Sequence, residues 1–248
     1  MLNQQTVDHL SDMRLKGMAD AYTQQLQNPS ILEMSFEERF GLIIDNEWIT
    51  KKNRNLQRLL KAAHFRISSS LEEIDYTARR SLDRILINRL STGEWLNLHQ
   101  NLIICGPTGV GKTFLTCAFG NSACRFGYST RYYRVTRLVE ELLISKGDGS
   151  YSKLLDSLKK IQLLILDDWG LNSFTAAESR ELLEVIEDRN QIGSTIIAGQ
   201  LPIEHWAEIL PDPTITDAIL DRIVHNSYKL NVGGDSMRKY KSTISPNK

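Results

Sequence analysis

One short segment constrains the fold and function of this chain more than any other. The apolar residues 102–105 lead directly into Gly106-Pro-Thr-Gly-Val-Gly-Lys-Thr113, and a helix-compatible segment follows. This strand–loop–helix context is the one that the phosphate-binding P-loop requires. Its glycines let the backbone turn tightly and direct N–H groups at the β-phosphate, where the new helix adds the positive end of its dipole. The segment could also be a chance glycine-rich turn, but its context favours a binding site for a nucleoside triphosphate.

The same loop predicts individual ligands. Lys112 is expected to reach the β- and γ-phosphates, and the hydroxyl of Thr113 is expected to bind Mg²⁺. The predicted nucleotide-binding residues are Gly106, Pro107, Thr108, Gly109, Val110, Gly111, Lys112, Thr113 and Phe114.

A second apolar segment, residues 163–166, ends in two carboxylates, Asp167 and Asp168. A continuously apolar strand indicates burial on both faces, as in a parallel sheet, and its C-terminal end borders the crevice where ligands bind. After a P-loop, this pattern is typical of a Walker B strand. Asp167 would act on Mg²⁺, and Asp168 would orient or polarise the attacking water. The alternative is a strand that ends in an acidic turn without a role.

A further buried strand, residues 194–199, is followed by the polar Gln200. The side chain of Gln200 could reach the γ-phosphate or the water, although a loop residue without a role fits the pattern nearly as well. Because strands alternate with helices along this part of the chain, we expect an α/β domain with a parallel sheet flanked by helices.

The first 68 residues have helical periodicity, interrupted at residues 28–30, and Ser35 with Glu38 forms a capping box. One helix face is basic, and no acid lies between Glu47 and Glu72. This face is either a solvated surface or a contact for DNA phosphates, which Lys and Arg bind with release of counterions. The predicted DNA-binding residues are Lys51, Lys52, Arg54 and Arg58, followed by Arg79 and Arg80.

Two local features are expected where the helical part connects to the nucleotide domain. Residues 68–70 (Ser-Ser-Ser) are expected to form a hinge, and residues 76–86 are expected to form a helix. We therefore predict a helical domain over residues 1–68 and an α/β domain over residues 69–248.

Composition limits the kinds of partner and compartment. Thirty basic and thirty acidic residues balance, so a nucleic-acid site would have to be a local patch. No apolar run is long enough to span a membrane, and no secretory signal is visible. Cys105, Cys117 and Cys124 lack metal-binding spacing, which favours reduced core thiols in a cytoplasmic protein.

Several motifs resemble one branch of the P-loop ATPases. A polar residue at the end of the strand after Walker B makes the chain resemble the AAA+ branch. Residues 101–113 and 163–170 resemble the IstB family, the ATP-binding helpers of bacterial insertion sequences. The resemblance extends to residues 15–19, to Leu201-Pro with Trp206, to residues 217–225 and to Gly234-Asp-Ser-Met-Arg238, which matches the family's Gly-Glu-Ser-Tyr-Arg pattern. It covers nearly the whole chain. Relatives of the same domain load replicative helicases or open replication origins.

The resemblance implies an AAA+ ATPase that binds ATP and Mg²⁺, associates with itself on duplex DNA and assists a transposase. Arg222 would be an arginine finger that reaches the ATP of a neighbouring subunit, and Arg238 would sense the nucleotide. Arg222 could instead form only a surface pair with Asp221. The predicted catalytic residues are Lys112, Asp167, Asp168, Gln200, Arg222 and Arg238.

Two positions depart from the family pattern. Gly199-Gln200 replaces the usual Ser-Asn, and Asp168 stands where many AAA+ ATPases have Glu. The shorter carboxylate predicts slow hydrolysis. Three other functions fit the same core: a DnaC-like helicase loader, a small-molecule kinase, and a module that holds ATP without hydrolysing it.

Overall fold

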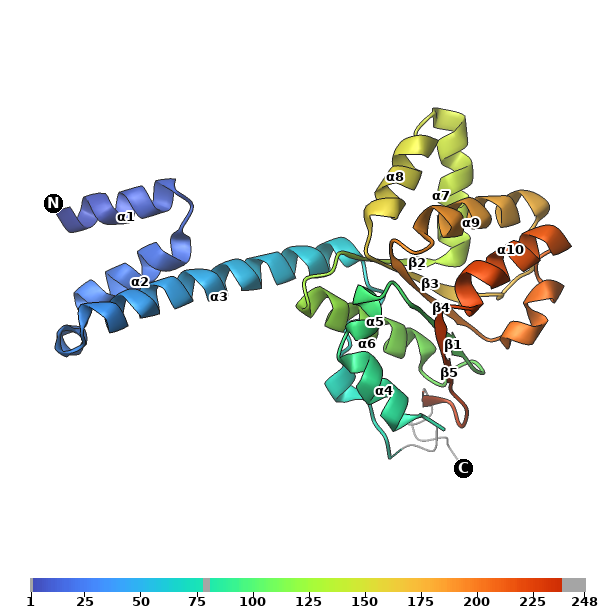
Figure 1. The fold of residues 1–248 in the computed structure, drawn as a ribbon, viewed down its shortest axis with the longest axis horizontal. Coiled ribbons are helices and arrows are strands. Elements are labelled where there is room, and N and C mark those ends of the chain that lie inside the picture. The colour runs from blue at the N-terminus through green and yellow to red at the C-terminus, as the bar shows by residue number, and fades with distance from the viewer. Residues whose placement is uncertain (1, 78–80, 238–248) are drawn as a thin grey trace, which may run out of the picture. The chain divides into compact units, whose positions relative to one another are not determined.

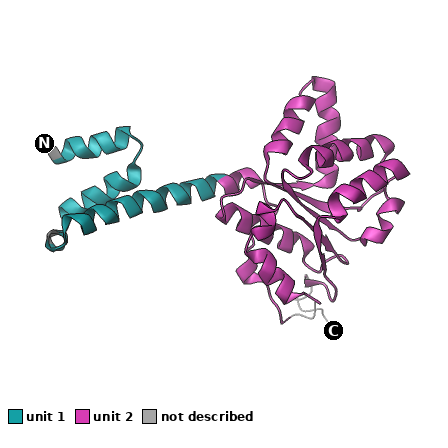
Figure 2. Ribbon diagram, in the orientation of Figure 1, with its two compact units in different colours: residues 1–58 teal, residues 59–248 magenta. Residues whose placement is uncertain are grey.

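The computed structural model describes residues 2–77 and 81–237, which form two compact units, residues 1–58 and 59–248 (Figures 1 and 2). The predicted domain boundary after residue 68 stays a prediction.

The first unit is helical, as the periodicity predicts. It contains α1 (Leu2–Asp12), α2 (Lys16–Gln27), the 3₁₀ turn η1 (Pro29–Glu33) and most of α3 (Phe36–Ala63). The predicted capping box is present before α3, since the Ser35 amide donates to Glu38 Oε2 at 2.8 Å and the Glu38 amide donates to Ser35 Oγ at 3.2 Å.

The second unit is built on a parallel sheet. Its strands are β1 (Asn101–Cys105), β2 (Thr130–Arg134), β3 (Leu163–Trp169), β4 (Ser194–Gly199) and β5 (Ser227–Asn231), in the spatial order β2-β3-β4-β1-β5. The P-loop strand β1 therefore lies between β4 and β5, and the Walker B strand β3 is next to β4. Strands β1, β3 and β4 are almost completely buried, as their apolar sequences predict.

Helices cover both faces of this sheet (Figure 1). One face packs against α7 (Val135–Asp148), α8 (Tyr151–Lys160), α9 (Ala176–Arg189), η3 (Ile203–Glu208) and α10 (Pro213–Val224). The other packs against η2 (Leu71–Glu73), α4 (Arg84–Ser91), α5 (Glu94–Asn97) and α6 (Lys112–Arg125). The chain thus has the predicted α/β architecture. Among the described helices, none is both long and apolar enough to cross a membrane.

Two local predictions are wrong. The expected helix over residues 76–86 instead begins at Arg84, because Asp83 caps it by accepting from the Leu86 amide at 2.9 Å; residues 78–80 lie outside the described part. The expected hinge at residues 68–70 is anchored, since Ser69 is buried and donates to the Phe114 carbonyl at 3.0 Å. Ser70 forms a capping box with Glu73.

One arginine is part of the core. Arg189, at the end of α9, is 2% exposed and donates to the carbonyls of Leu158, Ile161 and Ser194 at 2.5–2.7 Å. These bonds tie the start of β4 to the segment between α8 and β3. Burial lowers the pKa of Arg189 to about 10, so it stays charged at neutral pH and satisfies carbonyl groups that would otherwise lack partners.

Candidate nucleotide site

The P-loop is shaped by glycines at positions where a side chain would be strained. Gly111 caps the N-terminus of α6 with φ +101°, in the left-handed region. A side chain at Gly106 would place its Cβ 2.0 Å from the Val232 carbonyl oxygen. The segment after β5 supports the loop, because the amides of Val232 and Met237 donate to the carbonyls of Cys105 and Gly109 at 2.8 and 2.9 Å.

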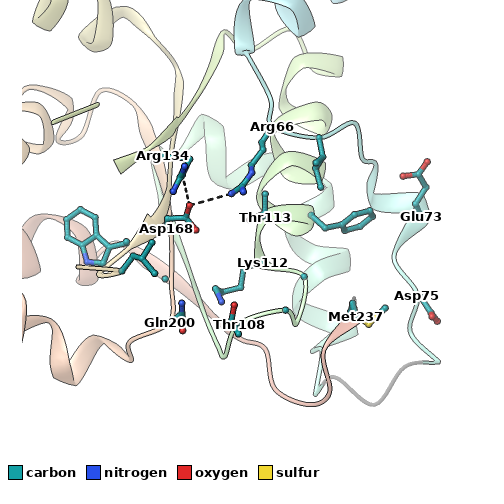
Figure 3. Close-up of a pocket in the computed structure, with 17 residues that line it drawn as sticks. Arg66, Glu73, Asp75, Thr108, Lys112, Thr113, Arg134, Asp168, Gln200 and Met237 are labelled. Carbon is teal, nitrogen blue, oxygen red and sulfur yellow. Dashed lines mark hydrogen bonds and ion pairs between the residues drawn. The ribbon is translucent and has the colours of Figure 1, made fainter. Parts of the chain in front are cut away.

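The loop borders an open cavity of about 740 Å³ at the C-terminal ends of the strands (Figure 3). The Lys112 Nζ atom lies at the loop and donates to the carbonyls of Gly106 and Pro107 at 2.7 and 2.8 Å. Eight residues predicted from the sequence line this cavity: Thr108, Gly109, Gly111, Lys112, Thr113, Phe114, Asp168 and Gln200. Backbone that only glycine allows, a lysine and a helix N-terminus together fit a bound triphosphate.

The predicted metal ligands lie next to each other. Thr113 Oγ1 donates to Asp167 Oδ2 at 2.7 Å, and Asp167 is only 1% exposed because it lies beneath the cavity surface. A hydroxyl and a carboxylate are hard oxygen donors, which suit Mg²⁺ when substrate phosphates complete its coordination. Among the described residues, no cluster of three or more His, Cys, Asp or Glu side chains offers a self-sufficient metal site. The donor set therefore fits a nucleotide-associated Mg²⁺.

The second carboxylate reaches the cavity through a distorted strand end. The pairing of β3 with β4 shifts between Leu166 and Trp169, and Asp168 has φ +62°. Neighbouring residues of a regular strand face opposite sides, whereas a bulge re-aims a side chain. Asp168 Oδ2 accepts from Arg134 Nε at 2.8 Å and from Arg66 Nη1 at 3.4 Å (Figure 3).

Three further residues join this network: Arg66, Tyr132 and Arg134. The Tyr132 hydroxyl donates to Asp167 Oδ2 at 2.8 Å, and burial followed by the Asp167 charge raises the pKa of Tyr132. The pKa of Arg66 is raised, first by a hydrogen bond with the Tyr132 phenol and then by the charge of Asp168. Partial desolvation acts in the opposite direction but is outweighed. Tyr132 and Arg134 lie on β2, which pairs with β3, so a strand pattern in the sequence could have pointed to them, but no sequence signal marks Arg66.

Of the two predicted catalytic arginines, only Arg222 lies among the described residues, and it does not line this cavity. Arg222 lies on α10, where it pairs with Glu187 of α9 and donates to the Ala218 carbonyl at 3.0 Å; it is absent from the residues that line the cavity. Its partner is thus Glu187 rather than the Asp221 considered from the sequence. Arg238, Arg79 and Arg80 lie outside the described residues.

The four predicted DNA contacts on α3 are exposed side chains within the first unit. Lys51 Nζ lies 3.4 Å from Glu47 Oε1, which partly neutralises it. Lys52 Nζ lies 4.4 Å from the centre of the Trp48 ring, and Arg58 donates to Asn55 Oδ1 at 2.9 Å. Their DNA-binding role stays a prediction.

Comparison with known proteins gives consistent results. The family described as IstB-like ATP binding protein matches residues 8–245. The insertion sequence ATP-binding protein y4pL of Sinorhizobium fredii is 44% identical over 96% of this chain and 98% of its own length. The insertion sequence IS1162 ATP-binding protein of Pseudomonas fluorescens is 45% identical over 82% of this chain and 88% of its own length.

Solved structures share much of this fold. DnaI has 22% identity and a TM-score of 0.58 over 71% of this chain and 93% of its own. The DnaC helicase loader has 17% identity and a TM-score of 0.53 over 71% of this chain and 98% of its own. At these identities, the likeness concerns the fold alone.

Proposed function

The chain belongs to the family of IstB-like ATP-binding proteins, and we propose that it is an AAA+ ATPase that assists DNA transposition. The observation that carries the ATPase assignment is the convergence of Lys112, Thr113, Asp168 and Gln200 on one cavity, with Asp167 directly beneath it. The insertion-sequence names of its relatives support the transposition context.

Each side chain has a distinct task in the proposed hydrolysis. The P-loop amides and Lys112 would hold the β- and γ-phosphates and stabilise the charge that develops on them. Thr113 and Asp167 would hold Mg²⁺, which neutralises phosphate charge when bound. Asp168 would orient the attacking water, and the Gln200 amide would hydrogen-bond the γ-phosphate or that water.

Self-association would complete the site. Because Arg222 does not line the cavity of its own subunit, a role in catalysis requires the ATP of a neighbouring subunit. Arg222 is paired with Glu187, so it would have to exchange this partner before it could reach the ATP of a neighbour. ATP-dependent association and hydrolysis would then be coupled, as a molecular switch requires.

DNA would be bound through local basic patches, since the chain as a whole is neutral. Lys51, Lys52, Arg54 and Arg58 are the leading candidates, and the assembled protein would present duplex DNA to a partner transposase.

The deciding experiment measures the mass of the protein on duplex DNA with ATP or ADP, for the wild type and for Arg222→Ala. We expect a large assembly with ATP that is lost with ADP and weakened by the substitution. A monomer that is indifferent to both DNA and nucleotide would reject the transposition assignment. Co-purification with a hexameric helicase, or stimulation by single strands only, would instead favour a helicase loader.

A further inference from the structure

A cation from outside the P-loop lies in the nucleotide cavity. Arg66 follows α3 in an irregular segment, and it lines the cavity together with Lys112 and Thr113. Its guanidinium is directed toward Asp168, with Nη1 at 3.4 Å from Oδ2 (Figure 3).

The segment that carries Arg66 is fixed on both sides. Arg131 Nη1 donates to the Ala62 carbonyl at 3.0 Å, and Ser69 Oγ donates to the Phe114 carbonyl at 3.0 Å. Phe65 packs against α6, so closely that a Cβ at Gly120 would lie 2.4 Å from its ring. These contacts hold the backbone on both sides of Arg66, while its long side chain remains 46% exposed.

The two arginines on Asp168 are not equivalent. Arg134 ends β2, and its Nε lies 2.8 Å from Asp168 Oδ2. Arg66 makes the longer contact to the same oxygen. One carboxylate therefore contacts two cations, and its contact with Arg66 is the weaker of the two, because a charge-assisted hydrogen bond normally has a donor–acceptor distance near 2.8 Å.

We infer that Arg66 is a phosphate-binding residue that moves from Asp168 to the γ-phosphate when a nucleoside triphosphate binds. This inference rests on the proposed nucleotide site. A terminal phosphate carries more negative charge than one carboxylate and presents three acceptor oxygens, which a planar guanidinium can bind in pairs. The exchange removes one of the two cations from Asp168 as the triphosphate arrives, so the carboxylate becomes available to orient water. A diphosphate has no γ-phosphate and leaves Arg66 on Asp168.

The test compares affinities for a non-hydrolysable ATP analogue, Mg²⁺-AMPPNP, and for Mg²⁺-ADP by calorimetry. We expect Arg66→Gln to lower the affinity for AMPPNP about tenfold, which is the effect of removing one charge-assisted hydrogen bond. The affinity for ADP should change less than about twofold. Arg66→Lys keeps the charge but not the planar fork, so an intermediate loss of affinity is expected.

The chain offers a closely matched control in Arg125→Gln. Arg125 is 47% exposed and pairs with one carboxylate, Glu72, at 2.7 Å, but it does not line the cavity. Arg125→Gln should change the affinity for neither AMPPNP nor ADP. If Arg66→Gln leaves the triphosphate-to-diphosphate ratio at the wild-type value, whether both affinities fall or neither does, the inference is overturned. Should Arg66→Gln not fold, the same ratio in Arg66→Lys decides.

A double-mutant cycle with Asp168→Asn tests the exchange itself. If Arg66 must leave Asp168, removing that carboxylate charge raises AMPPNP affinity more in the wild-type background than in Arg66→Gln. Equal increases in both backgrounds would mean that Arg66 and Asp168 act independently, which contradicts the exchange. Lys112→Ala tests the nucleotide site independently of Arg66, because it should lower the affinities for both AMPPNP and ADP. If it lowers neither affinity, the nucleotide site itself is misassigned.

Discussion

Tyr132 donates its hydroxyl to the same Asp167 oxygen, Oδ2, that accepts from Thr113, at distances of 2.8 and 2.7 Å. The two donors come from β2 and from the first turn of α6, so one buried carboxylate connects the P-loop, the Walker B strand and the strand next to it. A neighbouring strand thereby fixes the orientation of a proposed metal ligand, as outer hydrogen bonds do at metal sites.

Replacing Tyr132 with Phe should loosen this carboxylate without changing its charge. We expect the Mg²⁺ concentration for half-maximal ATP hydrolysis to rise about tenfold, within the range for removal of outer hydrogen bonds, and the free energy of unfolding to fall by about 1–3 kcal/mol. Tyr133→Phe removes a hydroxyl from the adjacent residue, which is outside the cavity, and serves as the control. An unchanged Mg²⁺ requirement in Tyr132→Phe would show that Asp167 is oriented without this bond.

The positive φ of Asp168 determines which substitutions can test it. Asn and Asp tolerate the left-handed region better than other residues with a side chain, so Asp168→Asn should fold normally, bind ATP and lose hydrolysis by roughly 100-fold or more. Asp168→Glu restores the acid of many AAA+ ATPases but should lower the free energy of unfolding by about 1 kcal/mol because of backbone strain. Steady-state hydrolysis and urea unfolding measure both effects. Wild-type turnover in Asp168→Asn would exclude the water-orienting role.

Sequence reasoning works best for features whose chemistry is local. The P-loop, the Walker B acids and the Ser35 capping box are each specified within a few residues, and the alternation of strands and helices predicted the sheet. The network around Asp168 was not predicted, because it depends on a register shift and on long-range contacts. Arg66 meets Asp168 from a segment about 100 residues earlier, and nothing in its neighbourhood marks it as a ligand. The misplaced helix at residues 76–86 reflects the same limit, since Asp83 was a stronger start signal than the helical periodicity before it.

Charge reversal on α3 tests the DNA assignment. Changing Lys51, Lys52, Arg54 and Arg58 to Glu should weaken duplex DNA binding and lower the slope of log affinity against log salt by about 0.9 for each phosphate that is no longer neutralised. Lys51 should contribute least, because Glu47 already lies beside it. Lys153→Glu with Lys160→Glu, on exposed positions of α8, is the control for the pair Arg54→Glu with Arg58→Glu, because both pairs change the net charge by the same amount. Unchanged affinity and slope in the α3 variant would disprove the assignment.

The stability of the protein at alkaline pH should depend on the ionisation of Cys105, the buried thiol of the P-loop strand. Burial raises the pKa of Cys105 from 9.0 to about 11. Between these values the unfolded chain releases the thiol proton and the folded chain keeps it, so the free energy of unfolding falls as pH rises, by at most about 1.4 kcal/mol per pH unit for this group. Urea unfolding from about pH 8 to about pH 10.5, a range that brackets the ordinary thiol pKa, should show a shallower decline in Cys105→Ala than in the wild type. Equal slopes would mean that the thiol has the same pKa in the folded and unfolded chain.

Mixing two inactive variants tests whether Arg222 acts between subunits. Arg222→Ala should still bind ATP through an intact cavity but lose hydrolysis by roughly 1,000-fold, as removal of an arginine finger does. Lys112→Ala should lose ATP binding but keep its arginine. In a mixed assembly, a Lys112→Ala subunit can supply Arg222 to the ATP of an Arg222→Ala neighbour, so hydrolysis should exceed the sum of the two separate proteins.

The pair with Glu187 adds a second expectation to the same experiment. Because Arg222 must leave Glu187 to reach a neighbour, Glu187→Gln should lower the protein concentration at which ATP-dependent assembly begins. Glu184→Gln, at a neighbouring acid on α9, is the matched control. Mixed proteins with no activity beyond their sum, together with a Glu187→Gln variant that assembles like the wild type, would assign Arg222 to the stability of α9 and α10 instead of catalysis.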